Sequence, residues 1–310
     1  MYLTGNSGFY PAGYEQIFYY EPTQSLQVSV GSVLKLINNK QITRTDIEIL
    51  SFLFEFNMAS LEQLQLLFSE SDDINKFKGR LDRLVQYRLL NKFCLGEDEK
   101  QFNDNAYLVY CIDKGGADLL LHLKDGEDYT GFRIERIIQP ALRVWKHIIA
   151  VDFYIRLLQS CPNKLLTYRV TPTIPFGKLR IIPHFSIAIE HKDNTKYFVG
   201  DIVLSSDVSA LATRSESFME KAIQFETLVS TNLYKKCFGV ENPPTLMFIA
   251  EDEETMGRVA QILSTTDIGQ YTQYRITTPE LLNKPLGDKG VFYSYKNDKL
   301  VSAPNGVFTE

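Results

Sequence analysis

Cysteine is scarce in this chain of 310 residues, and its cysteines form no metal-binding pattern. Cys94, Cys111, Cys161 and Cys237 include no Cys-x-x-Cys pair, and no His-rich spacing accompanies them, so a zinc site is not expected. Cys94 and Cys111 could face each other across a hairpin. Free buried thiols in a reducing cytosol are the favoured interpretation.

Long apolar runs and a net positive charge are absent as well. No stretch approaches the roughly 18 apolar residues of a membrane span, and the N-terminus lacks the basic region and apolar core of a signal peptide. We therefore expect a cytoplasmic protein without membrane contact. The formal net charge of −5 excludes a globally basic coat for nucleic acid, so any DNA contact must come from a local patch.

Phosphate loops are also missing. The double glycine at Gly115 and Gly116 lacks the Gly-x-x-x-x-Gly-Lys-Ser/Thr spacing, and no strand, loop and helix continue from it in that order. We expect no cofactor.

The first half of the chain has the pattern of a winged helix. Thr43 and Ser60 each begin a capping motif that precedes apolar residues at helical spacing, and a third helical pattern runs over 74–90. Two apolar strands follow as a hairpin, at 92–95 and 106–112. Three helices followed directly by a hairpin predict a helix-turn-helix module with a wing.

The third helix is basic although the chain as a whole is acidic. Its predicted outward cations are Lys76, Lys78, Arg80, Arg83 and Arg88, against the single acid Asp82. Such a helix enters a major groove, and cations supply affinity for phosphate. These five residues and Lys92 are the predicted DNA contacts, with Arg80 and Arg83 the leading candidates. The alternative is a solvated basic face on a winged helix that binds protein.

Two segments flank this domain of residues 41–124. Residues 1–40 form an aromatic-rich arm, which we expect to pack on its own protein because almost no cations lie among its aromatics. Stacking on nucleic acid or another subunit is the alternative. Residues 125–163 are predicted to hold a long bridging helix over 132–159, with a kink or break near Gln139 caused by Pro140.

Residues 164–310 predict a mixed sheet with helices on its faces. The expected strands are 165–170, 178–182, 185–190, 196–204, 245–250 and 274–277, and the expected helices are 217–231 and 253–263. The tail from 283 is expected to be loop with room for one hairpin. The chain is therefore of the α+β class.

Such a sheet can carry a metal-dependent nuclease site, which needs an acid on one strand and an acid and a lysine on the next. His184 stands at the first position, Asp201 is present, and Val203 replaces the lysine. We expect no catalytic residues; an active site would use Asp201, His184 and Lys221.

Metal binding by His184 and His191 with Asp201 is a further interpretation of the same stretch. Local hydrogen bonding of His184 in a site that has lost its acid is favoured over it. We expect no metal.

The order of elements resembles the replication-relaxation family of plasmid and integrative-element proteins, over roughly residues 43–282. The similar stretches are 181–184 (an Arg-Pro-Asp motif in the family), 197–201 (a strand ending in an acid), 217–228 (a helix that carries a lysine, here Lys221), 244–250 and 275–281. The resemblance implies a winged helix, a bridging helix and a fold related to restriction endonucleases. Ile182 and His184 replace the motif's arginine and aspartate, and Gly200 stands near its acid, which implies a degenerate nuclease.

We therefore expect a non-enzymatic, duplex-DNA-binding protein of a plasmid or mobile element. It would act in replication, conjugative transfer or their transcriptional control. It would bind as a homodimer, because two-fold symmetry doubles a small footprint, and would contact replication or transfer proteins of the same element. The alternatives are a divergent Mg²⁺-dependent nuclease and a winged-helix adaptor that contacts only protein.

Overall fold

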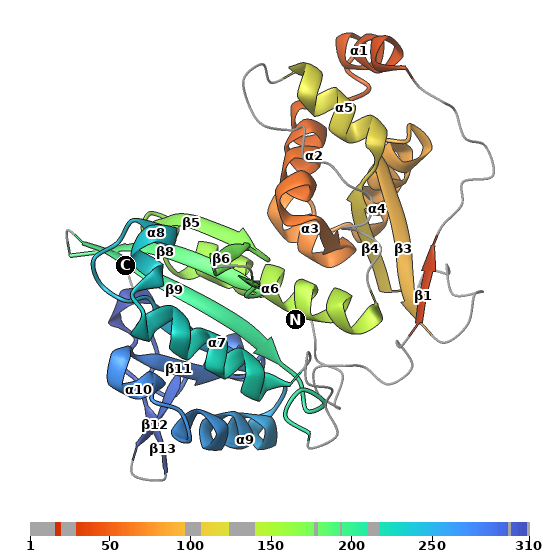
Figure 1. The fold of residues 1–310 in the computed structure, drawn as a ribbon. Coiled ribbons are helices and arrows are strands. Elements are labelled where there is room, and N and C mark those ends of the chain that lie inside the picture. Colours follow the sequence, from red (N-terminus) through yellow and green to blue (C-terminus); the bar gives the residue numbers. More distant parts are fainter. Residues whose placement is uncertain are drawn as a thin grey trace. The chain divides into compact units, whose positions relative to one another are not determined.

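A computed structural model describes residues 16–19, 29–96, 107–123, 140–176, 179–192, 194–209, 217–296 and 299–308. Residues 97–106, which include most of the predicted wing loop, and residues 124–139, where the predicted domain boundary falls, lie outside these residues. The chain divides into two compact units, and the division falls within helix α6 (Ala141–Ser160), between Val151 and Asp152 (Figure 1). Both units mix helices and strands, and the second contains a large mixed sheet, as the α+β prediction requires.

The first unit combines helices with a small antiparallel sheet. Its elements are β1 (Gln16–Tyr19), α1 (Val30–Asn38), α2 (Arg44–Phe56), β2 (Met58–Ser60), α3 (Leu61–Phe68), α4 (Ile74–Gln86), β3 (Leu90–Gly96), β4 (Tyr107–Ile112) and α5 (Lys114–Leu123). The strands lie in the order β1-β3-β4-β2, and all neighbours are antiparallel. The third predicted helix ends at Gln86, earlier than expected, because Arg88 adopts a left-handed conformation (φ 57°) and Leu90 begins β3.

Side-chain caps begin the helices of this unit where the sequence predicted them. The Asp46 carboxylate accepts hydrogen bonds from the Thr43 amide (2.7 Å) and hydroxyl (2.9 Å). Ser60 and Gln63 cap each other's backbone N–H groups at the start of α3. These reciprocal bonds satisfy N–H groups that have no partner within the helix.

The double glycine has a packing role. A Cβ atom at Gly115 would lie 2.5 Å from the Arg88 carbonyl oxygen, and one at Gly116 would lie 2.3 Å from that of Leu89. Only glycine therefore allows α5 to begin against the backbone that precedes β3.

One sequence-based expectation is corrected in this unit. Cys94 pairs with Leu108 and Cys111 with Asn91 in the β3–β4 ladder, so the two cysteines do not face each other.

Among the described residues, the bridging helix α6 begins at Ala141, directly after Pro140, whose carbonyl oxygen accepts hydrogen bonds from the Arg143 and Val144 amides. Residues 132–139, which include the expected break near Gln139, lie outside the described residues, so that part of the helix stays a prediction.

The second unit is built on a mixed seven-stranded sheet. Its strands, in the order β13-β12-β11-β10-β9-β8-β5, are Lys299–Ser302, Tyr293–Lys296, Tyr274–Thr277, Thr245–Ala250, Asn194–Val203, Phe185–His191 and Leu165–Val170. β10 is parallel to β9 and to β11, and the other neighbours are antiparallel. A separate small hairpin joins β6 (Ile174–Phe176) to β7 (Leu179–Ile181).

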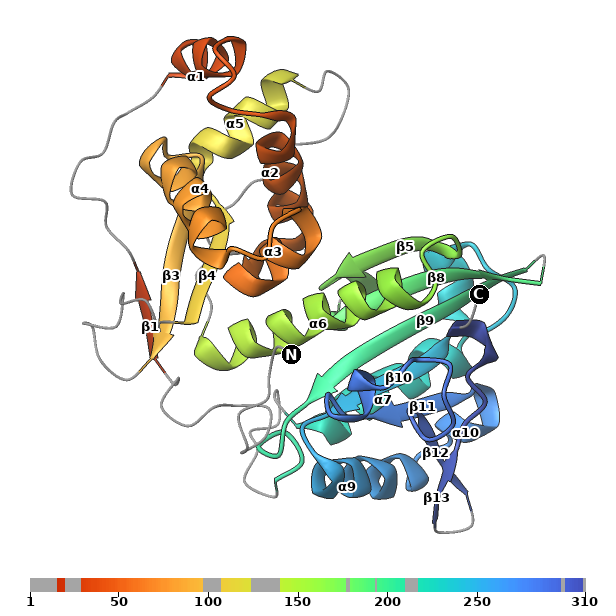
Figure 2. The ribbon, with the colours of Figure 1, turned by 180° about the vertical axis from the view of Figure 1, so that it is seen from behind.

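Helices cover both faces of this sheet (Figures 1 and 2). The helices of the unit besides residues 152–160 of α6 are α7 (Phe218–Ser230), α8 (Leu233–Phe238), α9 (Glu253–Ser264) and α10 (Ile268–Tyr271), with 3-10 turns η2 (Leu281–Asn283) and η3 (Gly306–Phe308). On one face Phe218 and Phe225 of α7 pack on Phe248 of β10. On the other, Phe153 of α6 packs on Phe185 of β8.

The C-terminal turn is held to the sheet by a buried arginine. The Arg275 guanidinium lies 5.4 Å to 5.9 Å from the ring centres of Phe198, Phe292 and Phe308. Burial lowers the pKa of Arg275 to about 10. The aromatic faces stabilise its positive charge and fix η3 against the sheet.

Candidate functional site

Helix α4 separates an apolar face from a polar one. Phe77, Leu81, Leu84 and Val85 are buried, and the Asp73 side chain begins the helix by accepting hydrogen bonds from two amides of its first turn. This spacing follows the period of the helix, so the remaining positions face outward. The cations predicted to bind DNA divide into two groups. The inner group consists of cations that contact carboxylates of this unit, and the outer group consists of exposed cations of α4.

Arg80 belongs to the inner group. Its Nε donates to Asp46 Oδ1 at 2.6 Å, and its Nη2 donates to the Thr43 hydroxyl. Asp46 is buried and the Arg80 side chain is one-quarter exposed. Arg80 therefore ties α4 to the first turn of α2, a role that the sequence analysis, which favoured it as a DNA contact, did not include.

Lys92 and Arg88 also contact carboxylates of their own unit. Lys92 Nζ lies 2.8 Å from Asp82 Oδ1, and only 10% of the Lys92 side chain is exposed. The Tyr110 hydroxyl donates to the same oxygen, and burial together with the Asp82 charge raises the Tyr110 pKa well above its ordinary value. Arg88 Nε lies 3.6 Å from Asp113 Oδ2.

Lys76 and Arg83 form the outer group. Both are exposed, and neither makes an ion pair within the described part of the chain. Lys78 is half-buried. Lys76 and Arg83 therefore carry most of the positive charge that α4 can present to an external anion.

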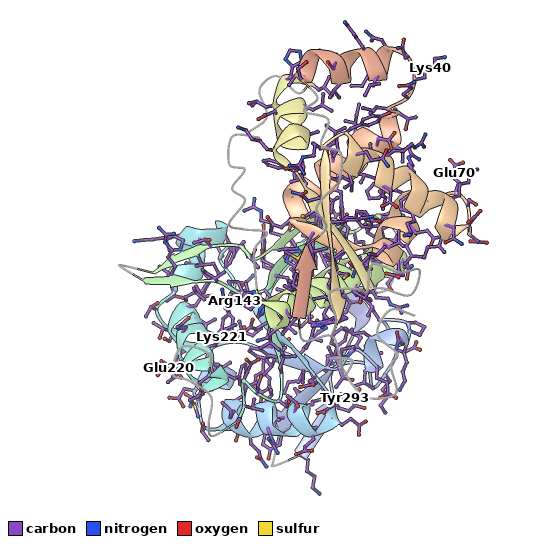
Figure 3. All side chains as sticks on the ribbon, turned by 90° about the vertical axis from the view of Figure 1, so that its right-hand side faces the viewer. Lys40, Glu70, Arg143, Glu220, Lys221 and Tyr293 are labelled. Atoms are coloured by element: carbon purple, nitrogen blue, oxygen red, sulfur yellow. The ribbon has the colours of Figure 1, made fainter. Side chains whose placement is uncertain are left out.

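The second unit brings together the three residues that an active nuclease would use. His184 precedes β8, Asp201 lies in β9, and Lys221 lies in the first turns of α7, where Figure 3 labels it beside Glu220. His184 Nδ1 contacts Asp201 Oδ1, and Lys221 Nζ lies 2.6 Å from Asp201 Oδ2. Both carboxylate oxygens thus have a nitrogen partner.

The Asp201 carboxylate is enclosed as well as paired. Its side chain is only 1% exposed, against 15% for His184 and 27% for Lys221. The His184 Nδ1 atom that contacts Asp201 also lies 3.1 Å from the Ile202 amide nitrogen. A buried carboxylate needs such compensation because loss of its hydration is costly. The arrangement is a buried ion pair with an imidazole beside it.

Metal binding by His184 together with His191 is contradicted. His191 ends β8 and pairs with Asn194. The two histidines are seven positions apart along an extended strand, which is about 23 Å at 3.3 Å per residue. Among the residues that the structure describes, no three His, Cys, Asp or Glu side chains gather as a metal site.

Val203, which stands where a nuclease would have its lysine, is buried in the apolar cluster beneath α7. The sequence offered Lys221 as the only nearby lysine on the following helix, and the structure places it on Asp201. By contrast, the pairing of Arg80 with Asp46 spans 34 residues, and no local signal in the sequence indicates it.

Comparison with known proteins identifies no family. No model of a known protein family matches the chain, and no curated protein sequence matches it significantly. Among solved structures, the restriction endonuclease FokI is similar to 77% of this chain with 11% identity and a TM-score of 0.27, and FokI bound to DNA is similar to 79% with the same identity and TM-score. The chain matches 42% and 44% of those longer chains.

No helix in the described segments has the length and apolar character needed to cross a membrane.

Proposed function

We propose that this protein binds duplex DNA through a winged helix in its first unit. The observation that supports the proposal most is the order α2-β2-α3-α4-β3-β4 with strands arranged β3-β4-β2, which agrees with the order expected for a winged helix, together with a polar, basic face on α4. In that arrangement α4 is the helix that enters the major groove. Lys76 and Arg83 are placed to contact phosphates or base edges.

The second unit is proposed to be a non-catalytic platform. The order α6-β5-β8-β9-α7-β10, with β10 parallel to β9, supports the restriction-endonuclease-like core that the sequence resemblance implies. The ion pair of Asp201 with Lys221 supports a structural role, because a metal ion would have to displace an internal cation from a buried carboxylate.

The biological setting follows from the resemblance to the replication-relaxation family. We place the protein in the cytoplasm, on a plasmid or mobile element, in replication, conjugative transfer or their transcriptional control. A homodimer is part of the proposal, because one α4 helix reads few base pairs and a two-fold pair reads two half-sites. Partners among the replication or transfer proteins of the same element would bind the second unit.

Charge reversal tests the proposal. We expect Lys76→Glu with Arg83→Glu to abolish binding to duplex DNA, because two cations on the proposed DNA-facing surface are replaced by acids that the phosphates repel. The matched control is Lys35→Glu with Lys40→Glu, which changes the net charge equally at exposed positions of α1 and its C-terminal flank. Equal loss in both variants, or loss in neither, would remove α4 from the account.

A divergent nuclease is the second candidate, favoured by the contact of His184, Asp201 and Lys221. Incubation of the purified protein with supercoiled and linear DNA and Mg²⁺ or Mn²⁺ tests it. We expect no cleavage. Cleavage that disappears in Asp201→Ala would establish the nuclease instead.

A further inference from the structure

The outward face of α4 has a glycine at its centre. Asn75, Gly79, Arg83 and Gln86 recur at spacings of four, four and three residues, so they form one stripe, and all are exposed. The stripe lies opposite the buried residues of the same helix. In the described chain, the large apolar side chains that are exposed include none from α4.

The fold does not explain this glycine. A Cβ atom at Gly79 would meet no described atom within 4 Å, and its backbone is not in the left-handed region. Gly115, Gly116 and Gly200 differ, because a Cβ atom at each would collide with a neighbour. Glycine is the least favourable residue after proline in a helix interior. Gly79 therefore weakens α4, and no contact with a described residue compensates for this.

A glycine at the centre of an exposed helical face lets another surface approach the helix backbone closely. We propose, resting on the DNA-binding function proposed above, that Gly79 allows α4 to lie deep in the major groove, so that Asn75, Arg83 and Gln86 reach base edges. Amide side chains pair with adenine and guanidinium groups with guanine, each through two hydrogen bonds. Lys76 beside the stripe contacts phosphate.

Duplex DNA fits this surface better than a protein does. The stripe consists of two amides, a glycine and an arginine, with Lys76 at its edge, and it contains none of the aromatic or methionine side chains that are enriched in protein interfaces. Polar groups that each present two hydrogen bonds match the edges of bases in the groove. A Cβ or longer side chain at Gly79 would hold the helix away from them.

The test is a substitution series with a matched control. Gly79→Ala should raise the melting temperature, because alanine favours the helix, and should weaken binding to a mixed-sequence duplex of about 30 base pairs, roughly three helical turns. Loss of one base contact corresponds to about tenfold in affinity. Gly79→Leu should weaken it further. Gly257→Ala is the control, since Gly257 lies inside α9 and its Cβ would also meet no described atom.

Gly257→Ala should raise the melting temperature and leave DNA affinity unchanged. Gly79→Ala that binds as tightly as the wild type would overturn the inference and leave the DNA-binding function standing. Gly79→Ala with a lowered melting temperature would also overturn it, because the glycine would then serve the fold. A wild-type protein that does not bind DNA at low salt would overturn the inference and the proposed function together.

Discussion

Arg80 and Arg83 have the same side chain on the same helix and different surroundings. Arg80 lies against the buried Asp46 carboxylate and the Thr43 hydroxyl. Arg83 is exposed. Removal of Arg80 leaves a buried carboxylate without its cation, whereas removal of Arg83 leaves only solvent. The two arginines therefore allow the stability of the first unit to be tested separately from its proposed contact with DNA.

We expect Arg80→Met to lower the free energy of unfolding by about 2 kcal/mol, the range for a lost hydrogen bond to a charged group. Arg83→Met should change it by less than about 0.5 kcal/mol and should weaken DNA binding. Urea unfolding of both variants, with a DNA titration of each, measures these quantities. A stable Arg80→Met protein would show that the ion pair with Asp46 contributes little.

The cysteines should differ in reactivity. Burial raises the pKa of the Cys94 thiol to about 11, and Cys111 and Cys161 are buried, whereas Cys237 is only partly buried. Ellman's reagent at pH 8 should therefore modify Cys237 first, since the thiolate is the reactive form. Rapid modification of all four cysteines in the folded protein would contradict the burial of Cys94, Cys111 and Cys161.

The raised pKa of Cys94 also sets a direction for alkaline stability. Between about pH 9 and pH 11 the unfolded state loses the thiol proton while the folded state keeps it, so this group makes stability fall as pH rises. Cys94→Ala should reduce that dependence. Thermal unfolding from pH 8 to pH 11 measures it, and an identical pH profile in the variant would contradict the assignment.

At the scale of elements, local signals predicted most of what is seen. Capping residues and apolar periodicity located α2, α3, α4, α7 and α9, and the pattern of apolar residues located β5, β8, β9, β10 and β11. The short elements β2, β6, α8 and α10 were missed, because three to six residues carry too little pattern to rise above their neighbours. β2 in particular is defined by its pairing with β4, about 50 residues away, and not by its composition.

The candidate sites were predictable to different degrees. Asp201, His184 and Lys221 could be named from the sequence because each lies in or directly beside a recognisable strand or helix. Their contact was not foreseen, since it depends on how α7 packs over β9. The division of the predicted DNA-binding cations into inner and outer groups was not predictable either. The carboxylate partners of the inner group come from α2, α4 and the residue after β4.

Gly200 shows how one residue sets the packing of strands. A Cβ atom there would lie 2.1 Å from the Phe185 ring and 2.7 Å from the Met247 carbonyl oxygen. We expect Gly200→Ala to destabilise the second unit by about 2 kcal/mol, as overpacking does. Gly200→Ala combined with Phe185→Leu should recover part of the loss. Unfolding with urea measures both, and an undamaged single variant would contradict the register of β8 on β9.

At the scale of the whole molecule, the chain joins two units of different character. The first carries the basic outward face of α4, and the second carries a sheet in which Lys221 neutralises the buried Asp201 carboxylate. The net charge of −5 leaves little general attraction to DNA, so the proposed binding would have to depend on a few cations of α4. Replacing Lys221 by methionine would leave the buried Asp201 without its ammonium partner. We expect this variant to lose stability by about 3 kcal/mol while its DNA affinity stays unchanged, because the affinity resides in the other unit. A loss of DNA affinity in a folded Lys221→Met protein would contradict that division of roles.

The salt dependence of DNA affinity tests the central claim most directly. The affinity of the purified protein for a mixed-sequence duplex would be measured from low to physiological salt, for the wild type and for Lys76→Ala with Arg83→Ala. The account predicts that log affinity falls linearly with log salt, because phosphate contacts release counterions, and that the slope of the double variant is shallower by up to about 2. Absence of binding at low salt, or the same slope in both proteins, would contradict it.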